Sequence, residues 1–183
     1  MKKNLHPIML AGTGSDVGKS VIAAALCRIF KQDGYRPAPF KAQNMALNSY
    51  ATPEGLEIGR AQAVQAEAAG VPCHTDMNPL LLKPSSDHTS QVVLNGRPIG
   101  NRNAFEYFRK EGREELRQEV NAAFDRLAAR YNPIVMEEAV PVPAIDGSLP
   151  PLLPDRESQV PSIGIPHKLS LIHISEPTRL GMI

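Results

Sequence analysis

Tryptophan is absent from this 183-residue sequence, and cysteine and aromatic residues are scarce. The two cysteines, Cys27 and Cys73, are too far apart for the usual metal-ligand or redox pair and too few for a disulfide framework, which favours a reducing, cytoplasmic location. A long hydrophobic run is also lacking near the start, where only residues 7–11 are apolar or small before Gly12. Because this stretch is shorter than a signal-peptide core or a membrane span, we expect neither export nor membrane insertion.

An excess of charge of either sign is missing as well. The sequence has 20 basic and 19 acidic residues, a formal net charge of +1, and no long run of like charges. A nucleic acid or an anionic membrane requires a basic face, so we expect neither as a partner. The 42% hydrophobic content is sufficient for the core of one ordinary domain.

Residues 7–136 alternate short apolar runs with longer amphipathic stretches, which is typical of an α/β fold with a parallel sheet and crossover helices. We expect strands at 8–11, 37–41, 80–82, 92–94 and 133–136, and helices at 18–31, 55–69 and 103–130. The pattern does not determine the order of the strands in the sheet. Cys27 falls among the apolar positions of the first helix, which indicates packing.

The character of the sequence changes after Glu138. Residues 139–168 contain seven prolines and show neither strand nor helix periodicity. Residues 169–179 resemble the conceptual translation of a transposase adapter used to prepare sequencing libraries. We therefore expect an α/β domain over 1–138 that is incomplete at its C-terminus, a frameshifted or chimeric segment over 139–168, and an adapter-like artefact over 169–183.

A glycine-rich turn joins the first expected strand to the first helix. It reads Gly12-Thr13-Gly14-Ser15-Asp16-Val17-Gly18-Lys19-Ser20. In this context backbone N–H groups can surround phosphate oxygens at a helix N-terminus, Lys19 can reach the β- and γ-phosphates, and the Ser20 hydroxyl can bind Mg²⁺. Thr13 stands where the standard phosphate loop has its first glycine, so the spacing is not strict. The turn predicts a nucleotide site for ATP and Mg²⁺.

Two other interpretations of this turn are weaker. A dinucleotide-binding fingerprint needs glycine at position 17, where this sequence has Val17. A plain strand-to-helix turn has no need of Gly18, Lys19 and Ser20 together.

The turn resembles the phosphate loop of the dethiobiotin synthetase-like P-loop superfamily, in which Thr13 and an acid at position 16 are typical. Further strings look like the N-terminal ATPase domain of the cobyric acid synthase family: Pro39 to Ser49, Glu57 to Gln62, Asp76 to Pro84, and Gly96-Arg97 to Gly100-Asn101. The resemblance covers roughly residues 7–137 and is far more specific than the loop alone.

This resemblance implies a ligase that activates a corrinoid carboxylate with ATP in cobalamin biosynthesis. It then amidates the carboxylate with ammonia released from glutamine by a C-terminal glutaminase domain, a glutamine amidotransferase that this sequence lacks. A carboxylate is a poor electrophile, so phosphorylation supplies the leaving group that ammonia displaces, and Lys and Mg²⁺ neutralise the transferred phosphoryl group. We expect Lys19 and Lys41 to act in catalysis, since Lys41 follows a strand and can place a second ammonium near the γ-phosphate or the substrate.

Carboxylates are the natural partners of Ser20 around Mg²⁺, which prefers hard oxygen ligands. Glu137 is the best candidate because it ends an apolar strand as a Walker-B-type acid does. In the family this position opens a Glu-Gly-Ala-Gly string, whereas here Glu138 and Val140 stand in place of the glycines. Glu57 and Asp16 are weaker metal candidates, and each can equally be a solvated acid.

Other functions remain open. A switch-type ATPase of the same superfamily would carry a lysine five positions before Lys19, where this sequence has Gly14. A dethiobiotin synthetase-like ligase is disfavoured by the string from Gln43 to Ser49, and a non-functional fragment is the third possibility. The string from Cys73 to Asp76 has too few ligands for a metal site and indicates an ordinary loop.

Overall fold

The computed structural model describes residues 3–12, 18–86, 89–103, 110–137 and 170–174. The helices are α1 (Lys19–Gln32), α2 (Arg60–Ala69), α4 (Lys110–Ala128) and the short 3₁₀ helix η1 (Thr75–Met77). The strands are β1 (Ile8–Gly12), β2 (Ala38–Phe40), β3 (Gln43–Met45), β4 (Ser49–Ala51), β5 (Glu57–Gly59), β6 (Leu80–Ser86), β7 (Thr89–Leu94), β8 (Arg97–Asn103), β9 (Ile134–Glu137) and β10 (Ser170–Ile174).

The central sheet has the strand order β10-β1-β9-β2, and every pair in it is parallel. Consecutive parallel strands need a crossover, and α1 supplies the one between β1 and β2. The strand β9 lies between them, although it comes last among the three in the chain. The expected α/β fold with a parallel sheet and flanking helices is therefore confirmed.

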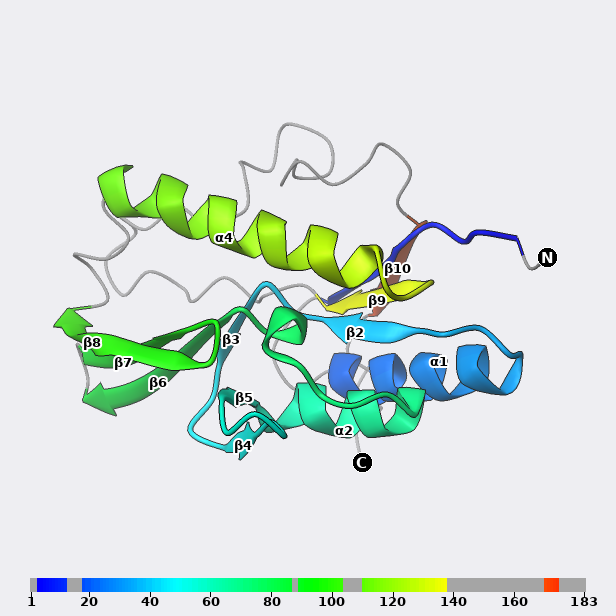
Figure 1. Cartoon of the computed structure of the whole chain (residues 1–183), viewed down its shortest axis with the longest axis horizontal. Coiled ribbons are helices and arrows are strands. Elements are labelled where there is room, and N and C mark those ends of the chain that lie inside the picture. Colours follow the sequence, from blue (N-terminus) through cyan, green and yellow to red (C-terminus); the bar gives the residue numbers. More distant parts are fainter. Residues whose placement is uncertain (1–2, 13–17, 87–88, 104–109, 138–169, 175–183) are drawn as a thin grey trace, which may run out of the picture.

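Helices cover both faces of this sheet (Figure 1). On one face α4 packs through Val120, Phe124 and Leu127, and the Phe124 ring meets Phe40 edge-on at a centroid distance of 5.3 Å. On the other face α1 and α2 close over Leu10 and Val135 with small residues, Ala23, Cys27 and Ala69. Strands buried on both faces explain the continuous apolar runs of β1 and β9.

The expected strands near residues 80–82 and 92–94 exist, but they lie outside the central sheet. They belong to β6 and β7 of a second sheet with the order β3-β6-β7-β8, in which β6, β7 and β8 are antiparallel. Short β4 and β5 form a separate antiparallel pair. In Figure 1 the second sheet extends to one side of the layered part of the molecule.

Two helices begin later in the structure than the sequence pattern predicted. The segment 55–69 is helical only from Arg60, because residues 57–59 pair with β4 and Gly55 has a left-handed φ of 76°. The segment 103–130 forms α4 from Lys110 to Ala128, and residue 103 ends β8. The alanines and glutamines of the first segment all lie within residues 61–69, which are helical, whereas residues 55–59 contain two glycines, which disfavour helix.

Residues 139–168 lie outside the described part of the chain. Within the last segment, Ser170–Ile174 forms β10, which pairs in parallel with β1 from Ile8 to Gly12. The interpretation of 139–183 as frameshifted, chimeric or adapter-derived stays a prediction.

Candidate nucleotide site

The strand register brings three distant parts of the chain to one edge of the central sheet. Strands β1, β9 and β2 are parallel, so their carboxyl ends lie together. Leu10 is paired with Glu137, and Phe40 is paired with Met136. Gly12 at the end of β1, Lys41 after β2 and Glu137 at the end of β9 therefore meet at this edge.

Glu137 is the centre of the site. Its side chain is 1% exposed, and its Oε2 accepts a hydrogen bond from the Ser20 hydroxyl at 2.8 Å. The Lys41 ammonium lies 3.3 Å from the same oxygen, and the Lys41 side chain is 14% exposed. A buried carboxylate needs a compensating charge and hydrogen bonds, and these two groups supply them.

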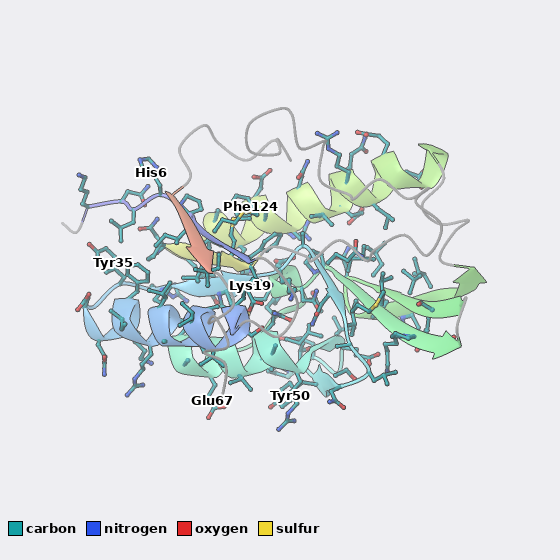
Figure 2. The ribbon with its side chains drawn as sticks, turned by 180° about the vertical axis from the view of Figure 1, so that it is seen from behind. His6, Lys19, Tyr35, Tyr50, Glu67 and Phe124 are labelled. Carbon is teal, nitrogen blue, oxygen red and sulfur yellow. The ribbon has the colours of Figure 1, made fainter. Side chains whose placement is uncertain are left out.

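Lys19 is the first residue of α1 and is buried, with 6% relative exposure. Gly18 precedes it with a φ of 95°, a left-handed conformation that favours glycine, and its carbonyl accepts hydrogen bonds from the N–H groups of Val21 and Ile22. Figure 2 shows Lys19 near the middle of the molecule and Tyr35 beyond the other end of the same helix. The last part of the predicted phosphate loop thus opens a helix next to Glu137.

Gln65 also contacts Glu137, and our sequence interpretation missed it. Its side-chain amide donates to Glu137 Oε1 and to the Ser20 carbonyl, the latter at 3.2 Å. A usable signal was present, because the polar Gln62 and Gln65 share one helical face with Ala66 and Ala69. Polar side chains on the buried face of a helix require partners, and such partners often belong to a site.

The backbone of Lys41 is held at both of its polar groups. Its N–H donates to the Met77 carbonyl at 2.9 Å, and its carbonyl accepts from the Asn78 amide at 3.1 Å. The same Asn78 side chain bonds the Leu80 carbonyl at 3.0 Å and the Gly59 N–H at 3.0 Å. Asn78 therefore ties the end of β2 to the start of β6 and to the β5–α2 junction.

An ionic cluster around Asp76 anchors η1, whose Met77 carbonyl accepts the hydrogen bond from the Lys41 N–H. Asp76 has a side chain with 3% exposure, and its two oxygens accept hydrogen bonds at 2.8–3.0 Å from Arg126 of α4 and from Arg130, which follows α4. His74 Nδ1 lies 3.1 Å from the same carboxylate. The hydrogen bonds between Arg126 and Asp76 raise the pKa of the Arg126 guanidinium, and the negative charges nearby raise it further. We expected an ordinary loop at Cys73 to Asp76. In the structure this segment includes the start of η1, and Asp76 ties η1 to Arg126 and Arg130.

Glu57, another candidate metal ligand, pairs with a different residue from those around Glu137. Glu57 forms an ion pair with Lys83 at 2.6 Å. Partial burial raises the pKa of Glu57, but hydrogen bonds from Lys83 and Ser49 outweigh this effect and leave the pKa below its ordinary value. Asp16, Thr13, Gly14, Ser15 and Val17 lie outside the described residues, and Gly12 ends β1.

The residues present fit a Mg²⁺ ion that is shared with a nucleotide. The Ser20 hydroxyl and the Glu137 carboxylate are hard oxygen donors on one side, and Mg²⁺ takes its other ligands from phosphate and water. Among the described residues no group of three or more His, Cys, Asp and Glu side chains could hold a metal by itself. Burial, followed by the negative charge of Glu137, raises the pKa of the Cys27 thiol to about 12, which fits a packing role in the core.

Fold and site together define a P-loop-type nucleotide-binding domain, with a helix that follows a glycine-rich turn and an acid at the end of a neighbouring strand. The profile of the CobQ/CobB/MinD/ParA nucleotide binding domain matches residues 8–174. The chain belongs to this family of nucleotide-binding domains.

Several curated relatives that match the chain are cobyric acid synthases. The protein from Phocaeicola vulgatus is 99% identical over 139 residues, which are 76% of this chain and 28% of that protein. The protein from Bacteroides fragilis strain YCH46 is 91% identical over 139 residues with the same coverage, and that from Parabacteroides distasonis is 68% identical over 140 residues. The chain thus spans about 28% of the length of these relatives.

Within the described residues, no helix has both the length and the apolar character that a membrane crossing requires.

Proposed function

We propose that this chain is the ATP-binding part of an amide-forming ligase that amidates the side-chain carboxylates of a corrinoid in cobalamin biosynthesis. The nearly identical match to a cobyric acid synthase supports this function. The observation that carries it is the convergence of Ser20 Oγ and Lys41 Nζ on one oxygen of the buried Glu137. These are the groups that a ligase needs at the phosphate end of a nucleotide.

Each residue of the cluster has a role in this proposal. When bound, ATP supplies a phosphoryl group that converts a substrate carboxylate into an acyl phosphate, from which ammonia displaces phosphate. Lys19, at the N-terminus of α1, contacts phosphate oxygens, and the glycine-rich sequence before it supplies further contacts to the phosphates in this proposal. Ser20 and Glu137 hold Mg²⁺. Lys41 orients the phosphate or the substrate carboxylate and stabilises negative charge.

The substrate carboxylate and the ammonia reach this site from outside the chain described here. We propose that a C-terminal glutaminase domain in the full-length protein releases ammonia from glutamine. The cytoplasm is the proposed location, because ATP, glutamine and reduced cysteines occur together there. Glu57, which pairs with Lys83, and Asp16 remain secondary proposals for metal binding.

The last part of the chain carries a separate proposal. Residues 1–138 form the partial ATP-binding domain, 139–168 derive from a frameshift or a chimeric junction, and 169–183 derive from an adapter. The length of the match to Phocaeicola vulgatus, 139 residues, supports the first boundary. Translation of the source DNA beyond the Glu137 codon in the other two frames tests this origin, and a Gly-Ala-Gly-like continuation is the expected result.

The function is tested in the full-length Phocaeicola vulgatus protein, which is 99% identical to this chain over 139 residues. Incubation with a corrinoid carboxylic acid, ATP, Mg²⁺ and glutamine labelled at the amide nitrogen should give labelled corrinoid amides and ADP. Product masses identify each converted carboxylate. Formation of ADP and amide with no dependence on a corrinoid acid would contradict the proposed substrate class.

A further inference from the structure

The side chain of Gln65 joins three elements at the proposed nucleotide site. It lies on the inner face of α2 and is 2% exposed. Its Nε2 group has two hydrogens, and both are used: one bonds Glu137 Oε1 at the end of β9, and the other bonds the Ser20 carbonyl in the first turn of α1. The amide therefore links the helix that follows the phosphate loop to the acidic residue.

These contacts divide the two oxygens of Glu137 between different partners. Gln65 occupies Oε1, whereas Ser20 and Lys41 both approach Oε2. A carboxylate held at both oxygens cannot rotate about its last bond without losing hydrogen bonds. Gln65 therefore helps to determine which oxygen of Glu137 faces Ser20 and Lys41.

The chemical type of this side chain also matters. A carboxylate at position 65 would repel Glu137, and a lysine would neutralise it. An amide holds the carboxylate in place and adds no charge. An ion pair joins Lys41 to Glu137, and the Gln65 amide adds no second positive charge beside the carboxylate.

We propose that Gln65 is a positioning residue that orients Glu137 so that its Oε2 oxygen, next to Ser20, receives Mg²⁺. The inference rests on the proposed nucleotide site and adds to it a residue that does not touch the ion. Groups that orient metal ligands typically change metal affinity or activity by about 10–100-fold when they are removed.

The test compares two glutamines of the same helix. Gln65→Met keeps the side-chain length and removes both N–H donors. Gln62→Met is the matched control, because Gln62 is also fully buried and bonds Asn44 instead of Glu137. Both changes are made at the corresponding positions of the full-length Phocaeicola vulgatus protein. Binding of a non-hydrolysable ATP analogue is measured by calorimetry at increasing concentrations of Mg²⁺ and, separately, of Ca²⁺.

We expect Gln65→Met to raise the Mg²⁺ concentration needed for half-maximal nucleotide binding by about 10–100-fold. The preference for Mg²⁺ over Ca²⁺ should also decrease, because Mg²⁺ demands stricter ligand geometry. Gln62→Met should leave both properties as in the unaltered protein. Loss of a residue that only supports the fold would alter neither the Mg²⁺ dependence of nucleotide binding nor the preference for Mg²⁺ over Ca²⁺.

Equal Mg²⁺ dependence of Gln65→Met and Gln62→Met would overturn the positioning role. If Gln65→Met does not fold, Gln65→Asn provides the test, since it keeps the amide but shortens its reach, and an unaltered Mg²⁺ dependence there would overturn the role as well. Failure of the unaltered protein to bind the nucleotide with Mg²⁺ would instead contradict the proposed function itself.

Discussion

Ser20 and Glu137 are 117 positions apart in the chain, yet the Ser20 hydroxyl donates a 2.8 Å hydrogen bond to the Glu137 carboxylate. The contact exists because β1 and β9 are neighbours in a parallel sheet and α1 begins near the end of β1. It places a hydroxyl and a carboxylate, the two oxygen donors expected around Mg²⁺, next to each other at the start of α1.

Lys41→Met should reduce turnover of the full-length enzyme by about 10²–10³-fold, because it removes a cation from the proposed site of phosphoryl transfer. The stability should fall by about 1–3 kcal/mol, since the buried Glu137 then loses a charged partner. Lys83→Met is a suitable control, because Lys83 is also partly buried and paired with a glutamate. Steady-state turnover of Lys41→Met equal to that of Lys83→Met would rule out the catalytic role.

In the Asp76 cluster, loss of the carboxylate should reduce the stability less than loss of the two arginines. Asp76→Asn leaves two guanidinium groups that are 50% and 42% exposed, and water can hydrate them, so we expect a cost of about 1–3 kcal/mol. The double change Arg126→Met, Arg130→Met leaves a buried carboxylate without these partners and should cost about 3–5 kcal/mol. Amide hydrogen exchange in α4 measures both values. A larger cost for Asp76→Asn would contradict this order.

The ion pair between Glu57 and Lys83 should contribute a pH-dependent stability. The pKa of Glu57 is lowered in the folded protein, so the contribution is present above the ordinary value of 4.5 and is lost as the pH falls through the lower, folded value. A double-mutant cycle with Glu57→Gln and Lys83→Met should give a coupling of about 0.2–1 kcal/mol at neutral pH. The coupling should approach zero in more acidic solution. A coupling that grows as the pH falls would show that the sign is wrong.

Much of the site could be predicted from the sequence because its residues stand at the ends of recognisable strands. Ser20 follows a glycine-rich turn, Lys41 follows β2, and Glu137 ends an apolar run, so the parallel sheet alone brings them together. The second sheet could not be predicted in this way. An apolar run such as Leu80 to Leu82 looks the same whether its strand joins a parallel or an antiparallel sheet.

Gln65 and Asn78 show a second limit of sequence interpretation. Each acts through hydrogen bonds to residues from other elements, and no local pattern reveals which carbonyl or carboxylate an amide will meet. The close packing at Gly59 could not be predicted from a local pattern either. A Cβ atom added there would lie 2.7 Å from Gln62 Oε1 and 3.0 Å from Asn78 Oδ1. Only the assembled fold shows that glycine is required.

The nucleotide site is the central claim, and Lys19 tests it most directly. Calorimetric titration of the full-length Phocaeicola vulgatus protein with ATP and Mg²⁺ should compare Lys19→Ala with Lys31→Ala, a change at an exposed lysine near the other end of the same helix. We predict that Lys19→Ala weakens binding by about 10²-fold or more, because a buried cation at the phosphate groups is lost, and that Lys31→Ala binds like the unaltered protein. Equal affinity of the two variants for ATP would contradict the assignment of this site.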